Sequence, residues 1–167
     1  MQNGPLRCGR WVGWQGTLPP RSYRFRMEPL NLTTHRPRSP WLQLDGLYFM
    51  PRTIDKLRAS LPGGDMGQYK IYGFSSRLLH GLGIDEDALR EAVAAANTDD
   101  DVAQWLREHT DTSKYPELNE RLSTRRIMDL DDREDYYNRY PFARDLPPET
   151  LLMDALEKDD DRIYSAV

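Results

Sequence analysis

The sequence predicts an all-α fold, a small irregular helical bundle with coil-rich termini. Apolar residues recur at helical spacing in several short segments, and helix-capping residues precede the clearest of them. No two segments show the paired alternation expected of neighbouring strands. A chain of 167 residues with 38% hydrophobic side chains is long enough to bury one core. We therefore expect a single helical domain over residues 27–167.

Residues 1–26 differ from the rest of the chain in composition. They contain five arginines and no acidic residue, although the whole chain has a net charge of −4. They lack both helical periodicity and the apolar core of about 7–15 residues that a secretory signal needs. We interpret them as a disordered or mis-called extension, with Met27 as the natural start. The alternative is a basic arm that contacts a partner.

Prolines interrupt regular structure before the first clear helix. Pro37 and Pro40 each favour extended geometry in the residue that precedes them. Ser39 followed by Pro40 is typical of a helix start, because a capping hydroxyl precedes a proline at the first helical position. We therefore predict a short helix through residues 41–44 that ends at Gly46.

Residues 51–61 give the first strong helical pattern. Ile54, Leu57 and Leu61 recur at helical spacing and define one buried stripe. The Pro-Gly-Gly sequence that follows stops this helix. Residues 66–74 show weak alternation without a partner strand, so we expect a loop there.

Three further helices follow this loop. Ser75-Ser76 leads into a short helix that ends at Gly81 or Gly83. Asp85 caps a second helix and Thr98 caps a third, each with acidic residues in its first turn. The second and third helices are joined by about two residues, so they must be neighbours that cross at a substantial angle.

The helical pattern is weaker in the last third of the chain. Pro116 opens a helix, while prolines limit any helix in the polar and aromatic residues 129–149. A last helix is predicted over residues 149–157. We expect residues 159–167 to fray, and we interpret the acidic run Asp159–Asp161 as solvated.

The helix over residues 51–61 and the loop after it form the candidate site. We expect the charged side chains opposite the apolar stripe to be exposed, with carboxylate and guanidinium neighbours three residues apart. Lysine and arginine suit a carboxylate or phosphate, and tyrosines supply flat amphipathic contacts. The alternative is a solvated helix face with internal ion pairs. The candidate ligand-binding residues are Arg52, Asp55, Lys56, Arg58, Tyr69 and Tyr72.

Other kinds of site lack their sequence signals. The chain has one cysteine, which excludes an internal disulfide and favours a reducing, cytoplasmic location. Its three histidines have no ligand partner at helical spacing, and no nucleotide-binding or hydrolase motif occurs. We predict no metal and no cofactor. The acidic body argues against nucleic acid and anionic membranes, and no stretch approaches the roughly 20 apolar residues of a membrane span.

Five short motifs stand in order along residues 37–106. They are PRSP (37–40), LDGLYFMPRTIDKLRASL (44–61), GQY (67–69), LGID (82–85) and DVAQWL (101–106). This order resembles an uncharacterised bacterial family known as a domain of unknown function. The resemblance implies a compact cytoplasmic domain that starts at Met27, and it implies no activity. It places the family pattern on Arg52, Asp55, Lys56, Arg58 and Tyr69.

Three functions are compatible with these residues, and the oligomeric state stays open. The leading hypothesis is a non-enzymatic binding or accessory domain that receives an anionic group of a small molecule or partner protein. Arg52, Lys56 and Arg58 would bind the anion, and Asp55 would hold the guanidinium in place. The second is a cofactor-free enzyme that uses Lys56 or Tyr69, with a pKa lowered by neighbouring arginines, as acid or base. The third is a scaffold that binds a partner through Trp41, Tyr136, Tyr137, Tyr140 and Phe142.

Overall fold

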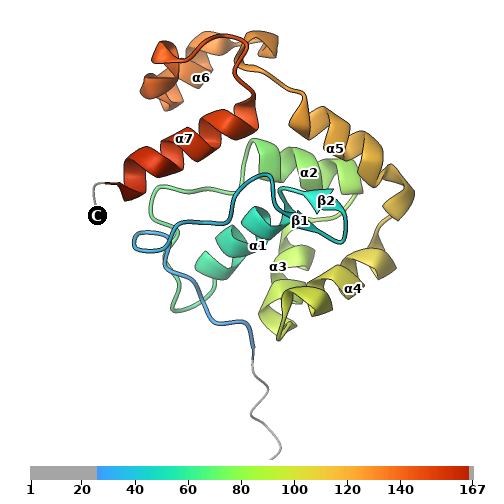
Figure 1. The fold of residues 1–167 in the computed structure, drawn as a ribbon. Coiled ribbons are helices and arrows are strands. Elements are labelled where there is room, and N and C mark those ends of the chain that lie inside the picture. The colour runs from blue at the N-terminus through green and yellow to red at the C-terminus, as the bar shows by residue number, and fades with distance from the viewer. Residues whose placement is uncertain (1–25, 166–167) are drawn as a thin grey trace, which may run out of the picture.

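The structure, a computed structural model, describes residues 26–165. Seven α-helices, three short 3₁₀ helices and one β-hairpin make up the regular structure of this part of the chain, so the predicted helical fold is confirmed apart from the small hairpin (Figure 1). The interpretation of residues 1–26 as an extension falls almost wholly outside the described part. None of the described helices is long and apolar enough to cross a membrane. The elements are β1 (Gln43–Leu44), β2 (Leu47–Tyr48), α1 (Met50–Ala59), α2 (Phe74–Leu82), α3 (Glu86–Ala95), α4 (Asp99–His109), α5 (Tyr115–Ser123), α6 (Arg133–Arg139) and α7 (Leu152–Tyr164).

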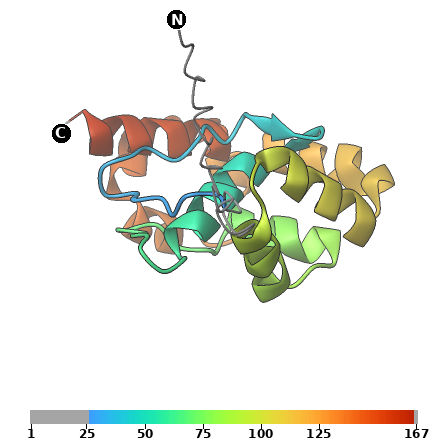
Figure 2. The same cartoon turned by 90° about the horizontal axis from the view of Figure 1, so that it is seen from below.

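Helix α1 runs through the middle of the molecule, with α2 and α3 on one side and α7 on another (Figures 1 and 2). Its predicted apolar stripe is confirmed for Ile54 and Leu57, which are fully buried, whereas Leu61 lies beyond the end of α1 and is only partly buried. Ile54 and Leu57 belong to one hydrophobic core, which also includes Leu89 of α3 and Leu106 of α4. The core therefore draws on every α-helix and packs against the aliphatic face of α1.

The predicted short helix before Gly46 is wrong, because a two-stranded hairpin occupies this position. Asp45 and Gly46 have φ angles of 52° and 80°, which allow the tight turn between β1 and β2. Asn119 of α5 holds the hairpin: its side chain accepts from the Tyr48 N–H at 2.9 Å and donates to the Gly46 carbonyl at 2.6 Å. A contact 71 residues away in sequence thus outweighs the local Ser39-Pro40 signal.

The helices with clear caps are confirmed. Asp85 accepts a hydrogen bond from the Asp87 N–H at 2.8 Å, and α3 begins at the next residue. Thr98 and Asp101 form a reciprocal capping box at the start of α4. Helix α2 ends at Gly83, which adopts the left-handed conformation. The loop predicted over residues 66–74 contains no strand.

The end of the chain is more ordered than predicted. Helix α7 continues to Tyr164, well beyond the expected end at residue 157. The expected fraying is wrong because Asp160, in the acidic run, is only 1% exposed and pairs with α1. Helix α6 lies just before Pro141, the first of the prolines in residues 129–149. Helix α7 therefore covers the side of α1 that we expected to face solvent.

Candidate functional site

The polar face of α1 is buried, in contrast to the sequence prediction. Arg52, Asp55 and Lys56 are 1%, 3% and 7% exposed. Helix α7 and the segment around Arg38 cover them. Burial of a charge is costly unless it is paired, so each of these groups needs a partner or a changed protonation state.

Arg52 has an internal partner. Its Nη1 and Nη2 atoms donate to the two carboxylate oxygens of Asp160 at 2.7 and 2.9 Å, and Nη1 also donates to the Arg38 carbonyl at 3.1 Å. Tyr69 donates to the same Asp160 carboxylate at 2.8 Å. The predicted bidentate interaction of Arg52 with a carboxylate is present, but this carboxylate belongs to Asp160 of α7 and not to a ligand. Arg52 is therefore engaged in holding the fold.

Asp55 and Arg58 also interact with groups of the same chain. Asp55 accepts hydrogen bonds from the Arg38 backbone N–H at 2.8 Å and from its guanidinium at 2.8 to 3.1 Å. Arg58 donates to the Glu28 carbonyl at 2.9 Å and lies 3.9 Å from Asp55. Asp55 therefore anchors Arg38 and not Arg52, and the expected ion pair of Arg52 with Asp55 is replaced by longer-range pairs.

Lys56 differs from its neighbours. Within residues 26–165 its ammonium has no hydrogen-bond or ion-pair partner, and its Nζ atom lies 5.5 Å from the centre of the Phe49 ring. Burial, reinforced by the charge of Arg52 and opposed by that of Asp160, lowers the pKa of Lys56 to about 7. A large fraction of Lys56 is therefore a neutral amine at neutral pH.

Lys56 lines two adjacent cavities, which we call together the Lys56 pocket. The larger has a volume of about 310 Å³ and is also lined by Arg52, Tyr69 and Tyr72. The smaller has a volume of about 100 Å³, and its walls include Phe49 and Tyr136. Four of the six predicted site residues thus meet at one pocket, whereas Asp55 and Arg58 do not line it.

Much of the remaining pocket wall comes from α6, α7 and the segment between them, which sequence reasoning did not assign to the site. Arg139 and Tyr140 line both cavities, and Arg162 lines the larger one. Asp159 lies there too, 3.2 Å from Arg162, and burial raises the pKa of its carboxyl. The only hint in the sequence was the aromatic and basic character of residues 136–144.

Tyr69 and Tyr140 of the pocket have raised pKa values and therefore stay neutral near pH 7. Burial and the nearby Asp160 raise the pKa of Tyr69 far above its ordinary value, against the predicted lowering by arginines. Burial, followed by the influence of Tyr72, raises the pKa of Tyr140 to about 12. The Tyr136 hydroxyl is buried and has no hydrogen-bond partner within the described chain. Neutral hydroxyls and excess cations thus line the pocket.

The aromatic side chains proposed for partner binding do not form an exposed patch. Tyr136 is buried, and the other four are partly buried and pack against the hydrophobic core. Trp41 also donates a hydrogen bond from Nε1 to Asp154 at 2.8 Å. Most of the surface that a partner would contact is therefore used within the domain.

Fold and site together define a helical domain in which a buried arginine–aspartate pair supports a cationic, tyrosine-lined pocket. The chain belongs to the DUF5069 family, a domain of unknown function whose family model matches residues 34–162. This confirms the resemblance to a domain of unknown function. The matched range contains every residue of the Lys56 pocket named above. No curated protein matches the sequence significantly.

Proposed function

We propose that this domain binds a small anionic molecule in the Lys56 pocket. One observation carries the proposal: Lys56 is only 7% exposed at a cavity wall and its ammonium has no partner within the described chain, although its charged neighbours on α1 are paired. An anion in the cavity would supply the missing partner. It would also restore the charged form of the lysine.

The charges around the pocket support an anion over a cation. Lys56, Lys70, Arg139 and Arg162 line the larger cavity, whereas Asp159 is its one acidic lining residue among those described and is paired with Arg162. The volume of about 310 Å³ is at the low end for small-molecule sites. A small carboxylate with a flat or apolar body fits this combination of cations, tyrosines and limited space.

Calorimetric titration with benzoate, 4-hydroxybenzoate and succinate tests the proposal. We expect saturable binding of at least one of them, and a loss of at least about tenfold in affinity in Lys56→Met. Lys158→Met is a matched control, because Lys158 lies exposed on α7. Equal affinity in wild type and Lys56→Met, with both variants folded, would rule out Lys56 as the receptor.

Proton uptake gives a sharper readout of the same event. Because the pKa of Lys56 is about 7 in the free domain, binding of an anion near pH 8 should take up close to one proton. The observed binding enthalpy then depends on the ionisation enthalpy of the buffer. This dependence should vanish in Lys56→Met and persist in Lys158→Met.

A cofactor-free enzyme is the second candidate, favoured by the lowered pKa of Lys56. An amine with a pKa of about 7 in a pocket suits proton transfer at neutral pH. Tyr69 is unsuited to this role because its hydroxyl is held by Asp160 and its pKa is raised. Turnover in a substrate screen that Lys56→Met abolishes would favour the enzyme over a binding domain.

A further inference from the structure

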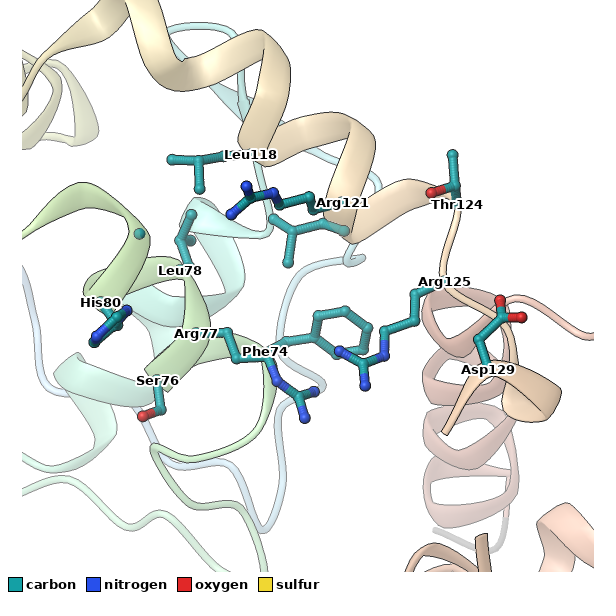
Figure 3. Close-up of a pocket in the computed structure, with 12 residues that line it drawn as sticks. Phe74, Ser76, Arg77, Leu78, His80, Leu118, Arg121, Thr124, Arg125 and Asp129 are labelled. Atoms are coloured by element: carbon teal, nitrogen blue, oxygen red, sulfur yellow. The ribbon is translucent and has the colours of Figure 1, made fainter. Parts of the chain in front are cut away.

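A second cavity, larger than either part of the Lys56 pocket, lies between α2, α5 and the segment that follows α5. Its volume is about 620 Å³. Figure 3 shows Arg77 of α2, Arg121 of α5 and Arg125 directed toward this space. We propose that this cavity, which we call the α2–α5 pocket, binds a phosphate monoester with an apolar organic group.

Two of the three arginines that line this pocket, Arg77 and Arg125, have no ion-pair partner in the described chain. The buried Arg125 Nε atom also has no hydrogen-bond acceptor within residues 26–165. Burial lowers the pKa of Arg77, the charges of Arg125 and Arg139 lower it further, and the charge of Asp131 partly opposes this. Like charges are thus gathered at one place and form no ion pair among the described residues, which raises the free energy of the empty site.

The acids near this pocket are already engaged. Asp129 lines it, but its carboxylate accepts from the Arg126 backbone N–H at 2.9 Å and from Arg126 Nε at 3.3 Å. Arg121 pairs with Glu117 on the exposed side of α5. Arg77 and Arg125 therefore remain as two guanidinium forks without an acidic partner in the described chain. A phosphate dianion, with three oxygens and two charges, matches two forks better than a carboxylate does.

The opposite part of the pocket is apolar. Leu78, Leu118 and Leu122 are at most 7% exposed, and all three line the cavity beside Phe74. Gly81 lets α2 approach α5 closely, because a Cβ atom there would lie 2.4 Å from Leu118 Cδ2. The volume far exceeds that of an inorganic phosphate ion, so the leucine-lined part has room for an aryl or alkyl group.

Titration with phenyl phosphate, in a dilute chloride buffer without other phosphate or sulfate, tests this proposal. We expect saturable binding that is tighter than that of inorganic phosphate or phenol. The methyl signals of Leu118 and Leu122 should shift on binding. Arg125→Gln and Arg77→Gln should each weaken binding about tenfold, the effect of one charge-assisted hydrogen-bonding group.

Two control variants locate the binding. Arg107→Gln removes an arginine of α4 that pairs with Asp45 at 2.9 Å, and it should leave the affinity for phenyl phosphate unchanged. Lys56→Met should also leave it unchanged, which separates this site from the Lys56 pocket. Arg77 lines the smaller Lys56 cavity as well, so Arg125 is the decisive residue.

Three results would overturn the proposal. They are the absence of saturable binding of phenyl phosphate, equal affinity in wild type and a folded Arg125→Gln, and loss of binding in Lys56→Met. Should Arg125→Gln fail to fold, Arg77→Gln together with the methyl shifts of Leu118 and Leu122 decides the same question. Thermal unfolding of each unliganded variant monitors folding.

Discussion

Replacement of Asp160 by asparagine should strongly destabilise the domain. Asp160 and Arg52 are each 1% exposed and share two short hydrogen bonds. The Asp160→Asn substitution would remove the negative charge and present an amide N–H₂ to a guanidinium that has only donors. Arg52 would then stay buried with only neutral acceptors, namely the Arg38 carbonyl and at most the one amide oxygen of the new side chain.

The cost follows from the bonds that are lost. Removing one partner of a buried ion pair costs about 3–5 kcal/mol, because the other charge stays buried without compensation. Tyr69 also loses the charged acceptor of its hydroxyl. We expect a loss of about 4 kcal/mol in the free energy of unfolding. This corresponds to a fall of about 12 °C in Tm for a domain of this size.

Urea and thermal denaturation of three variants measure this effect. Asp161→Asn is the matched control, because Asp161 is 63% exposed and should contribute less than about 1 kcal/mol through Arg36. The double variant Arg52→Met with Asp160→Leu should be more stable than Asp160→Asn alone, since it leaves no buried charge at this position. The reasoning fails if Asp160→Asn costs no more than Asp161→Asn.

Three further predictions concern a titrating group, a helix cap and a glycine. The pKa of Lys56 is about 7 in the folded domain and near its ordinary value of 10.5 in the unfolded chain. At pH values between these two, the unfolded chain therefore binds one more proton than the folded domain. Stability should therefore rise with pH between about 7 and 10.5, by up to about 1.4 kcal/mol per pH unit, and denaturation of Lys56→Met should show this rise abolished. Thr98→Ala should cost about 1 kcal/mol by removing the capping box with Asp101; an unchanged urea midpoint would contradict this role. Gly64→Ala should cost about 1–3 kcal/mol, because the added Cβ would lie 2.6 Å from the Ala59 carbonyl oxygen, and an unchanged Tm would refute this clash.

Local signals in the sequence were sufficient for several elements. Asp85 and Thr98 cap helices through side chains that bond to residues two or three positions away, so the information lies within one window. The stripe of Ile54 and Leu57 likewise follows from spacing alone. The hairpin at Gly46 depends on a distant residue of α5, and no local pattern contains that contact.

The site was only partly predictable for the same reason. Lys56 and Tyr69 could be selected from the sequence, and both line one cavity. The residues that surround them could not be predicted, because a run of three aspartates resembles a solvated turn unless its cationic partner is known. Asp160 meets Arg52 across 108 residues, and this contact reverses the expected exposure of α1. Periodicity indicates which helix face is apolar, but it does not indicate what covers the polar face.

The pairing of α1 with α7 also sets constraints on how the chain assembles. During synthesis, α1 emerges 108 residues before the aspartate that neutralises its arginine. Until then, burial of the unpaired cations of α1 would cost more free energy than burial of its aliphatic side contributes. The capped pair α3 and α4, whose contacts are local, can form sooner. Closure of the domain therefore awaits α7, and a nascent chain that lacks this helix should keep α1 hydrated and accessible to proteases.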